Sequence, residues 1–169
     1  MTKQSNVLKV DAHNDEISIG LSKSYLEDMS ETLTDILSDT YKLIIKNHVY
    51  HWNVSGPLFK PLHELTEAHY EALFAAADVI AERIRALGHI APAHLTDATN
   101  FAPSAKSVKN LTAEAMISDL IKDHEAAVRS MREAAKTAGD KTDVVTEDML
   151  TQRLTFHEKA LWMLRAHLA

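Results

Sequence analysis

The chain has 169 residues, a length that suits one domain with a hydrophobic core. Hydrophobic residues make up 46% of it, with 4 glycines and 4 prolines, and this composition favours a mostly helical soluble domain. The absence of cysteine excludes disulfides, thiolate metal sites and thiol nucleophiles. The formal charge of −6 argues against general nucleic-acid binding, which depends on lysine and arginine contacts to phosphate.

We expect neither a secretory signal nor a membrane anchor. The first residues are polar, and no apolar segment follows them. The most apolar run, residues 72–81, contains Asp78 and is too short to span a bilayer. Because a chain without cysteine also fits a reducing compartment, we expect a cytoplasmic protein that is nucleoid-associated only if it binds DNA.

The N-terminal half predicts an arm followed by two helices. Residues 1–20 are polar and lack a helical period, so we expect a flexible arm, with one domain over 21–169. From Ser22, apolar residues recur every three or four positions and predict a long amphipathic helix that ends before Gly56 and Pro57. A second helix is expected to begin around residues 57–61 and to end at Leu87, capped by Gly88.

The C-terminal half predicts two more long helices after a long connection. Residues 89–110 contain prolines and one short helical possibility, residues 95–101. A third helix is expected from a Thr112 cap to Gly139, and a fourth after Asp143. Short, long and short connections predict an all-α, ferritin-like four-helix bundle whose long crossover carries the short helix.

The second predicted helix carries two pairs of potential metal ligands. His63 and Glu67 are four residues apart, as are Asp78 and Glu82, so each pair shares a face of the helix. Glu67 and Asp78 are about 16 Å apart along the helix axis, whereas metal–ligand bonds are about 2 Å long. Each pair is therefore half a site, and two copies packed antiparallel about a two-fold axis would complete two sites per dimer.

His51, at the end of the first helix, is the natural fifth ligand. Imidazole together with several carboxylates suits Fe(II) better than Ca(II) or Mg(II), which avoid nitrogen, while Zn(II) remains a competitor. Two familiar metal motifs are absent. Glu67 stands where a helical zinc-protease motif needs its second histidine, and Glu-x-x-His, typical of di-iron sites inside one bundle, occurs nowhere.

Each of these residues also has a simpler interpretation. A carboxylate on a long helix is usually a solvated charge, and His51 could stabilise the end of its helix against the dipole. His48 and Trp52 are by default packing residues. The metal hypothesis rests on the joint placement of the ligands along one stripe.

The same region resembles the starvation-induced DNA-protection proteins (Dps), or mini-ferritins. The matching residues are His51-Trp52-Asn53, Gly56, His63-Glu64, Asp78 to Arg83 and Leu87-Gly88. The resemblance implies a hollow twelve-subunit shell, with Fe(II) oxidised by hydrogen peroxide at sites between two-fold partners and Fe(III) stored inside, protecting against oxidative damage. It assigns His51, His63 and Glu67 to one chain and Asp78 and Glu82 to its partner. The family usually has Asp where this chain has Glu67, and it places Trp52 close to the site, in a possible redox role.

The resemblance raises two further questions, iron uptake and DNA binding. Acidic residues around the start of the last helix are candidates for lining three-fold pores, although the helix dipole alone also favours acidic residues in a first turn. These are Asp140, Asp143, Glu147 and Asp148. The predicted arm has only Lys3 and Lys9 against three acidic residues, so we expect weak or no DNA binding at neutral pH. The alternatives are a nucleoid-associated structural assembly with a vestigial or zinc-filled site, and a helical interaction module without metal.

Overall fold

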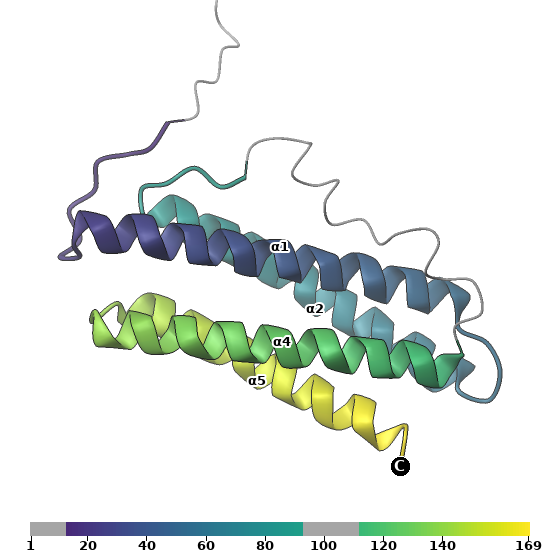
Figure 1. The fold of residues 1–169 in the computed structure, drawn as a ribbon. Coiled ribbons are helices and arrows are strands. Elements are labelled where there is room, and N and C mark those ends of the chain that lie inside the picture. Colours follow the sequence, from purple (N-terminus) through teal and green to yellow (C-terminus); the bar gives the residue numbers. More distant parts are fainter. Residues whose placement is uncertain (1–12, 93–111) are drawn as a thin grey trace, which may run out of the picture.

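Four long helices form the molecule, drawn in Figure 1 from a computed structural model that describes residues 13–92 and 112–169. They are α1 (Lys23–Asn53), α2 (Phe59–Ala86), α4 (Ala113–Asp140) and α5 (Val144–Ala166). The prediction of an all-α four-helix bundle is confirmed. The expected short helix at residues 95–101 and the first twelve residues of the expected arm lie outside the described ranges.

Helices α1, α4 and α5 begin where the sequence predicted them, and side chains cap their free amide groups. Helix α2 begins within its predicted range without a side-chain cap. The Ser22 hydroxyl accepts from the amide of Tyr25, and Thr112 does the same for Ala115. Asp143 caps α5 by accepting from the amide of Thr146. These predicted starts are confirmed.

Beyond the last turn of α2, Gly88 adopts a left-handed conformation with φ of +87°. The chain passes very close at this point, since a Cβ on Gly88 would come within 2.6 Å of the Asp15 carbonyl oxygen. The Asp15 amide donates to the Gly88 carbonyl over 2.7 Å, and Arg85 pairs with the Asp15 carboxylate at 2.8 Å. Ile17 packs against the core. The described part of the predicted arm is thus docked on the end of α2.

The bundle consists of two helical hairpins. α1 packs mainly on α2, α4 packs mainly on α5, and contacts between α1 and α4 join the two pairs (Figure 1). The residues between them are apolar and fully buried, among them Leu33, Leu62, Leu73, Ile80 and Leu120. No helix in the described part of the chain is apolar and long enough to cross a membrane.

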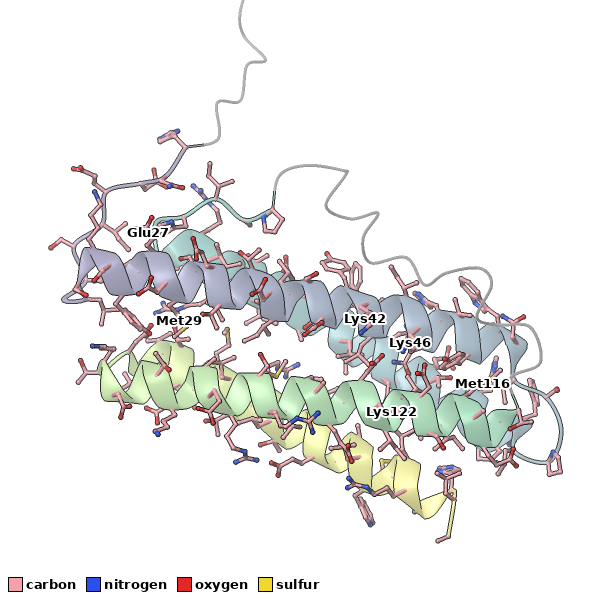
Figure 2. All side chains as sticks on the ribbon, in the orientation of Figure 1. Glu27, Met29, Lys42, Lys46, Met116 and Lys122 are labelled. Carbon is pink, nitrogen blue, oxygen red and sulfur yellow. The ribbon has the colours of Figure 1, made fainter. Side chains whose placement is uncertain are left out.

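A charged network reinforces the contact between α1 and α4. Figure 2 shows Lys42 and Lys46 on the stretch of α1 that faces α4. Lys46 is paired with Asp119 at 2.7 Å and also contacts the Asp123 carboxylate. These ion pairs join α4 to α1.

Candidate metal centre

Two of the predicted ligands, His51 and His63, face each other across the α1–α2 turn. His51 is in the last turn of α1 and His63 near the start of α2, and both are half-buried. Their rings stack with centroids 3.6 Å apart and planes 17° from parallel. The turn between α1 and α2 therefore brings two imidazoles, twelve residues apart in the sequence, into contact.

Reciprocal hydrogen bonds orient both rings. Nδ1 of His51 donates to the carbonyl of His63, and Nδ1 of His63 donates to the carbonyl of His51, each over 2.9 Å. A carbonyl oxygen only accepts, so both Nδ1 atoms carry the proton. In the neutral ring the lone pair then lies on Nε2, and a backbone bond of this kind is what typically orients a metal-binding histidine. Both rings are thus in the tautomer that binds a cation through Nε2.

The three predicted carboxylates lie exposed on the outer face of α2. Glu67, Asp78 and Glu82 all point to solvent in the single subunit. Glu67 is one turn beyond His63, whereas Asp78 lies about three turns and Glu82 about four turns further along. Within residues 13–92 and 112–169, no three His, Asp or Glu side chains of one subunit could hold a metal ion.

One apolar side chain, that of Phe74, interrupts this acidic face between the two ligand pairs. On a projection of about 100° per residue, Phe74 falls about 20° from Glu67 and about 40° from Asp78. Its side chain is 63% exposed. A large exposed aromatic residue within a stripe of carboxylates is typical of a surface that another chain covers.

Aromatic rings surround the histidine pair. His48 lies between Trp52, stacked at 5.4 Å, and Tyr70, at 4.0 Å. Tyr70 stands edge-to-face with His51 at 5.5 Å, and its hydroxyl donates to Glu67 over 3.5 Å. Burial, followed by the nearby His51, lowers the pKa of His48. The sequence analysis did not single out Tyr70, although its position three residues after Glu67 was a signal for this contact.

Known proteins are similar to this chain in sequence and fold. Residues 30–169 match the model of the ferritin-like domain. The chain is 34% identical to DNA protection during starvation protein 2 of Bacillus anthracis over 138 residues, which is 82% of this chain and 94% of the relative. The chain belongs to the Dps family.

Two further similarities extend over most of this Dps chain. A low temperature-induced protein of Nostoc is 36% identical over 152 residues, covering 89% of this chain and 85% of the relative. The X-ray structure of Dps from Thermosynechococcus elongatus superposes with a TM-score of 0.78 at 31% identity, covering 86% of this chain and 94% of that one. The recognition of a Dps family member from the sequence is thereby confirmed.

One of the pore candidates of this Dps chain is buried inside the subunit. Asp143 is only 3% exposed, and its carboxylate accepts from Thr146, from Tyr25 at 2.9 Å and from Arg83 at 2.7 Å. A carboxylate engaged by three helices cannot line a pore, so this candidate was wrong. Asp140, Glu147 and Asp148 are exposed and stay predictions.

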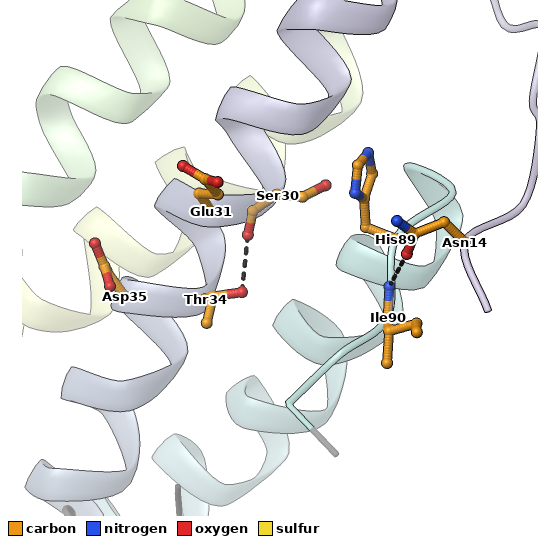
Figure 3. A pocket seen from close by; sticks show the side chains of 7 residues that line it. All are labelled: Asn14, Ser30, Glu31, Thr34, Asp35, His89 and Ile90. Atoms are coloured by element: carbon orange, nitrogen blue, oxygen red, sulfur yellow. Dashed lines mark hydrogen bonds between the residues drawn. The ribbon is translucent and has the colours of Figure 1, made fainter. Parts of the chain in front are cut away.

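The cavity shown in Figure 3 is separate from the histidine pair. It measures about 390 Å³ and lies between the first half of α1 and the segment that follows α2. Ser30, Glu31 and Asp35 line it from one side and His89 from the other. None of the five predicted metal ligands lines this cavity.

A second group of histidines, which the sequence analysis did not single out, lies in the core. His69, His124 and His157 come from α2, α4 and α5 and are 4%, 0% and 1% exposed. Nδ1 of His124 and Nδ1 of His157 share a hydrogen bond of 2.8 Å. Burial lowers the pKa of His157 to about 4, assisted by Arg153 and His69, and lowers that of His124 well below its usual value. The signal was their position on the apolar stripes of their helices.

Proposed function

We propose that this chain is a ferroxidase mini-ferritin that oxidises Fe(II) with hydrogen peroxide between two-fold partners and stores Fe(III) in a twelve-subunit shell, protecting against oxidative damage. One observation carries the proposal. His51 and His63 present two imidazoles in the cation-binding tautomer at one end of an exposed stripe, and Asp78 and Glu82 lie too far along that stripe to reach them. Each subunit thus carries two half-sites on one surface, and a two-fold symmetric dimer would join each half-site to the other half from its partner.

A single antiparallel register of two α2 helices completes both sites. The midpoint between His63 and Glu82 along the sequence coincides with the midpoint between Glu67 and Asp78, and both fall between Ala72 and Leu73. A two-fold axis at that point sets His63 opposite the partner's Glu82 and Glu67 opposite the partner's Asp78. The same operation repeats the arrangement on the other side, giving two equivalent sites.

Phe74 lies next to this axis and supplies the apolar contact of the interface. Its exposed ring would meet the partner's α2 near the centre, where burial of apolar surface contributes most to association. The dimer thus buries a residue that is 63% exposed in one subunit. Assembly of the dimers into a dodecamer is carried by membership in the Dps family.

The chemistry follows from the donors. Neutral imidazoles and carboxylates both bind Fe(II), the substrate, and the anionic oxygens favour the harder Fe(III) product. Two Fe(II) ions each give one electron to one hydrogen peroxide, which takes up two protons and becomes two water molecules. Consuming both oxidising equivalents of peroxide together prevents release of hydroxyl radical. Zn(II) could occupy the same donors, and it would then compete with the substrate.

The direct test is anaerobic titration with Fe(II) followed by peroxide, with ferric absorbance and particle size monitored together. We expect oxidation well above the buffer rate and shell-sized particles. Oxidation no faster than in buffer would refute the ferroxidase function. Wild-type activity in a His51→Ala, Asp78→Ala double variant would refute the ligand assignment.

A mixing experiment tests the sharing of the site. Dimers with His63→Ala in one chain and Asp78→Ala in the other carry both changes in one site, so the second site is intact. We expect about half of the wild-type activity per dimer, because one of two equivalent sites works. Homodimers of either variant are the matched controls. Mixed dimers as inactive as those homodimers would rule out a site shared between chains.

We further propose that DNA binding is weak or absent at neutral pH, although several relatives are named for DNA protection. The net charge of −6 repels phosphate, and multivalency would have to act on a very weak single contact. A gel shift at moderate salt is the test. Retardation of plasmid at nanomolar protein would favour the nucleoid-associated assembly instead.

A further inference from the structure

Tyr70 touches both helices that carry the proposed metal site. From α2, its hydroxyl donates to Oε1 of Glu67 over 3.5 Å. Its ring stands edge-to-face with His51 of α1, with centroids 5.5 Å apart and planes at 86°. Tyr70 thus contacts one proposed ligand on each helix.

The ring of Tyr70 is itself held in place. His48 packs against it at 4.0 Å, tilted by 40°, and Trp52 in turn stacks on His48 at 5.4 Å. Tyr70 is half-buried, whereas Glu67 is exposed. A supported phenol next to a free carboxylate can restrain that carboxylate.

Glu67 needs such a restraint more than the other ligands of its half-site do. His51 and His63 are fixed by bonds to the backbone, but a glutamate has a long flexible side chain that loses rotamer freedom when it binds. The phenol approaches Oε1 of Glu67 at 3.5 Å, the outer limit of a hydrogen bond. An aspartate at this position would be shorter by about 1.5 Å and would not span the same gap to the phenol.

We propose that Tyr70 is a positioning residue that holds the Glu67 carboxylate beside His51, so that Glu67 binds the cation through its second oxygen. This role rests on the proposed function, because it requires Glu67 to be a ligand. The proposal makes Glu67 and Tyr70 one functional unit, because the length of the glutamate side chain allows its carboxylate to reach the phenol. Tyr70 itself does not touch the metal.

A double-mutant cycle read by Co(II) binding tests this coupling. The four proteins are wild type, Tyr70→Phe, Glu67→Asp and the double variant, each titrated anaerobically with Co(II) and followed by visible absorbance. We expect Tyr70→Phe to weaken Co(II) binding about three- to tenfold with Glu67 present, the size of one ordinary hydrogen bond. In the Glu67→Asp background the same change should cost less than about twofold. Tyr41→Phe, about 15 Å along α1 from His51, is the matched control and should not alter binding.

Steady-state oxidation gives a second measurement. Tyr70→Phe should raise KM for Fe(II) with kcat within about twofold of wild type, since positioning of a ligand acts on substrate binding. Wild-type Co(II) affinity in Tyr70→Phe, or an equal loss in both backgrounds, would overturn the positioning role. If the Glu67→Asp protein binds Co(II) too weakly to titrate, Tyr70→Leu decides. A hydroxyl role predicts equal losses for Phe and Leu, and a ring role predicts loss for Leu alone.

Failure of the proposed function is recognised separately. A wild-type protein that neither binds Co(II) nor oxidises Fe(II) overturns the ferroxidase function and the role of Tyr70 with it. A wild type that does both, without coupling between residues 67 and 70, overturns only the role of Tyr70.

Discussion

The subunit holds two groups of histidines whose surroundings give them opposite properties. His51 and His63 lie half-buried at the α1–α2 turn, each with Nδ1 bonded to a backbone carbonyl and Nε2 available. His124 and His157 lie in the core and bond to each other, and Nε2 of His124 has no hydrogen-bond partner among residues 13–92 and 112–169. The same side chain is therefore prepared for a cation in one region and kept neutral within apolar packing in the other.

The difference shows that a count of histidines carries little information until the second nitrogen of each ring is accounted for. At the turn, the backbone supplies the bond that fixes the tautomer, and solvent or a partner can reach the other nitrogen. In the core, the two imidazoles are hydrogen-bonded to each other, and protonation of either would bury a charge. Function should follow the first group and stability the second.

The largest expected effect tests this division. We expect His51→Ala to lower the rate of Fe(II) oxidation about 100-fold, because it removes an imidazole donor and the ring that stacks on His63. His124→Leu should keep oxidation within about twofold of wild type while lowering the free energy of unfolding. Stopped-flow ferric absorbance and urea unfolding measure the two quantities. Wild-type oxidation in His51→Ala, or its loss in a folded His124→Leu, would reverse the division.

Carboxylates show the same contrast. Asp143 bonds to Tyr25, Arg83 and Thr146 inside the bundle, so Asp143→Ala removes the cap of α5 and leaves the Arg83 guanidinium without its carboxylate partner. We expect a loss of about 3 kcal/mol in the free energy of unfolding. Urea unfolding measures the loss, with the exposed Asp148→Ala as control. A change below about 1 kcal/mol would show that this network contributes little.

Acid should destabilise the core through its histidines. Burial lowers the pKa of His157 to about 4 from 6.5, so the unfolded chain binds more protons between these pH values. Stability is therefore unaffected above pH 6.5 and is lost as pH falls towards 4, by about 2 kcal/mol at pH 5 for this residue. Urea unfolding from pH 7 to pH 4.5 measures the slope. The slope should become shallower in a His124→Leu, His157→Leu variant and stay unchanged in His13→Gln, whose side chain is 76% exposed. Identical slopes in all three proteins would contradict this origin of acid sensitivity.

Much of this fold was predictable from the sequence because its signals are local. The caps at Ser22, Thr112 and Asp143 and the turn at Gly88 act within a few residues, and apolar periodicity marks the buried faces. The separation of the two ligand pairs followed from helix geometry alone. The sequence could not show the reciprocal bonds of His51 and His63, because they depend on how the α1–α2 turn closes.

The residues that escaped prediction all depend on tertiary packing. The sequence could not show that His124 and His157 would face each other from two different helices. Asp143 was a pore candidate because of the family resemblance, whereas Arg83 and Tyr25 from distant segments bury it. Each case involves a partner far away in the sequence.

The smallest expected effect concerns the exposed acidic residues left after Asp143 is removed from the pore candidates. We expect a Glu147→Gln, Asp148→Asn variant to slow Fe(II) uptake about two- to threefold at low ionic strength, because it weakens the field that attracts the cation. The effect should disappear in high salt, where surface charges are screened. Glu158→Gln, on the same helix about 16 Å from Glu147, is the control for loss of one exposed negative charge. The measurement is the rate of Fe(II) uptake over a series of salt concentrations. A slowdown that persists at high salt would mean that Glu147 and Asp148 do not guide iron. The same conclusion would follow if Glu158→Gln slowed uptake equally. Glu147 and Asp148 would then be ordinary solvated charges at a helix start. They would differ from Asp143 only in their contribution to stability.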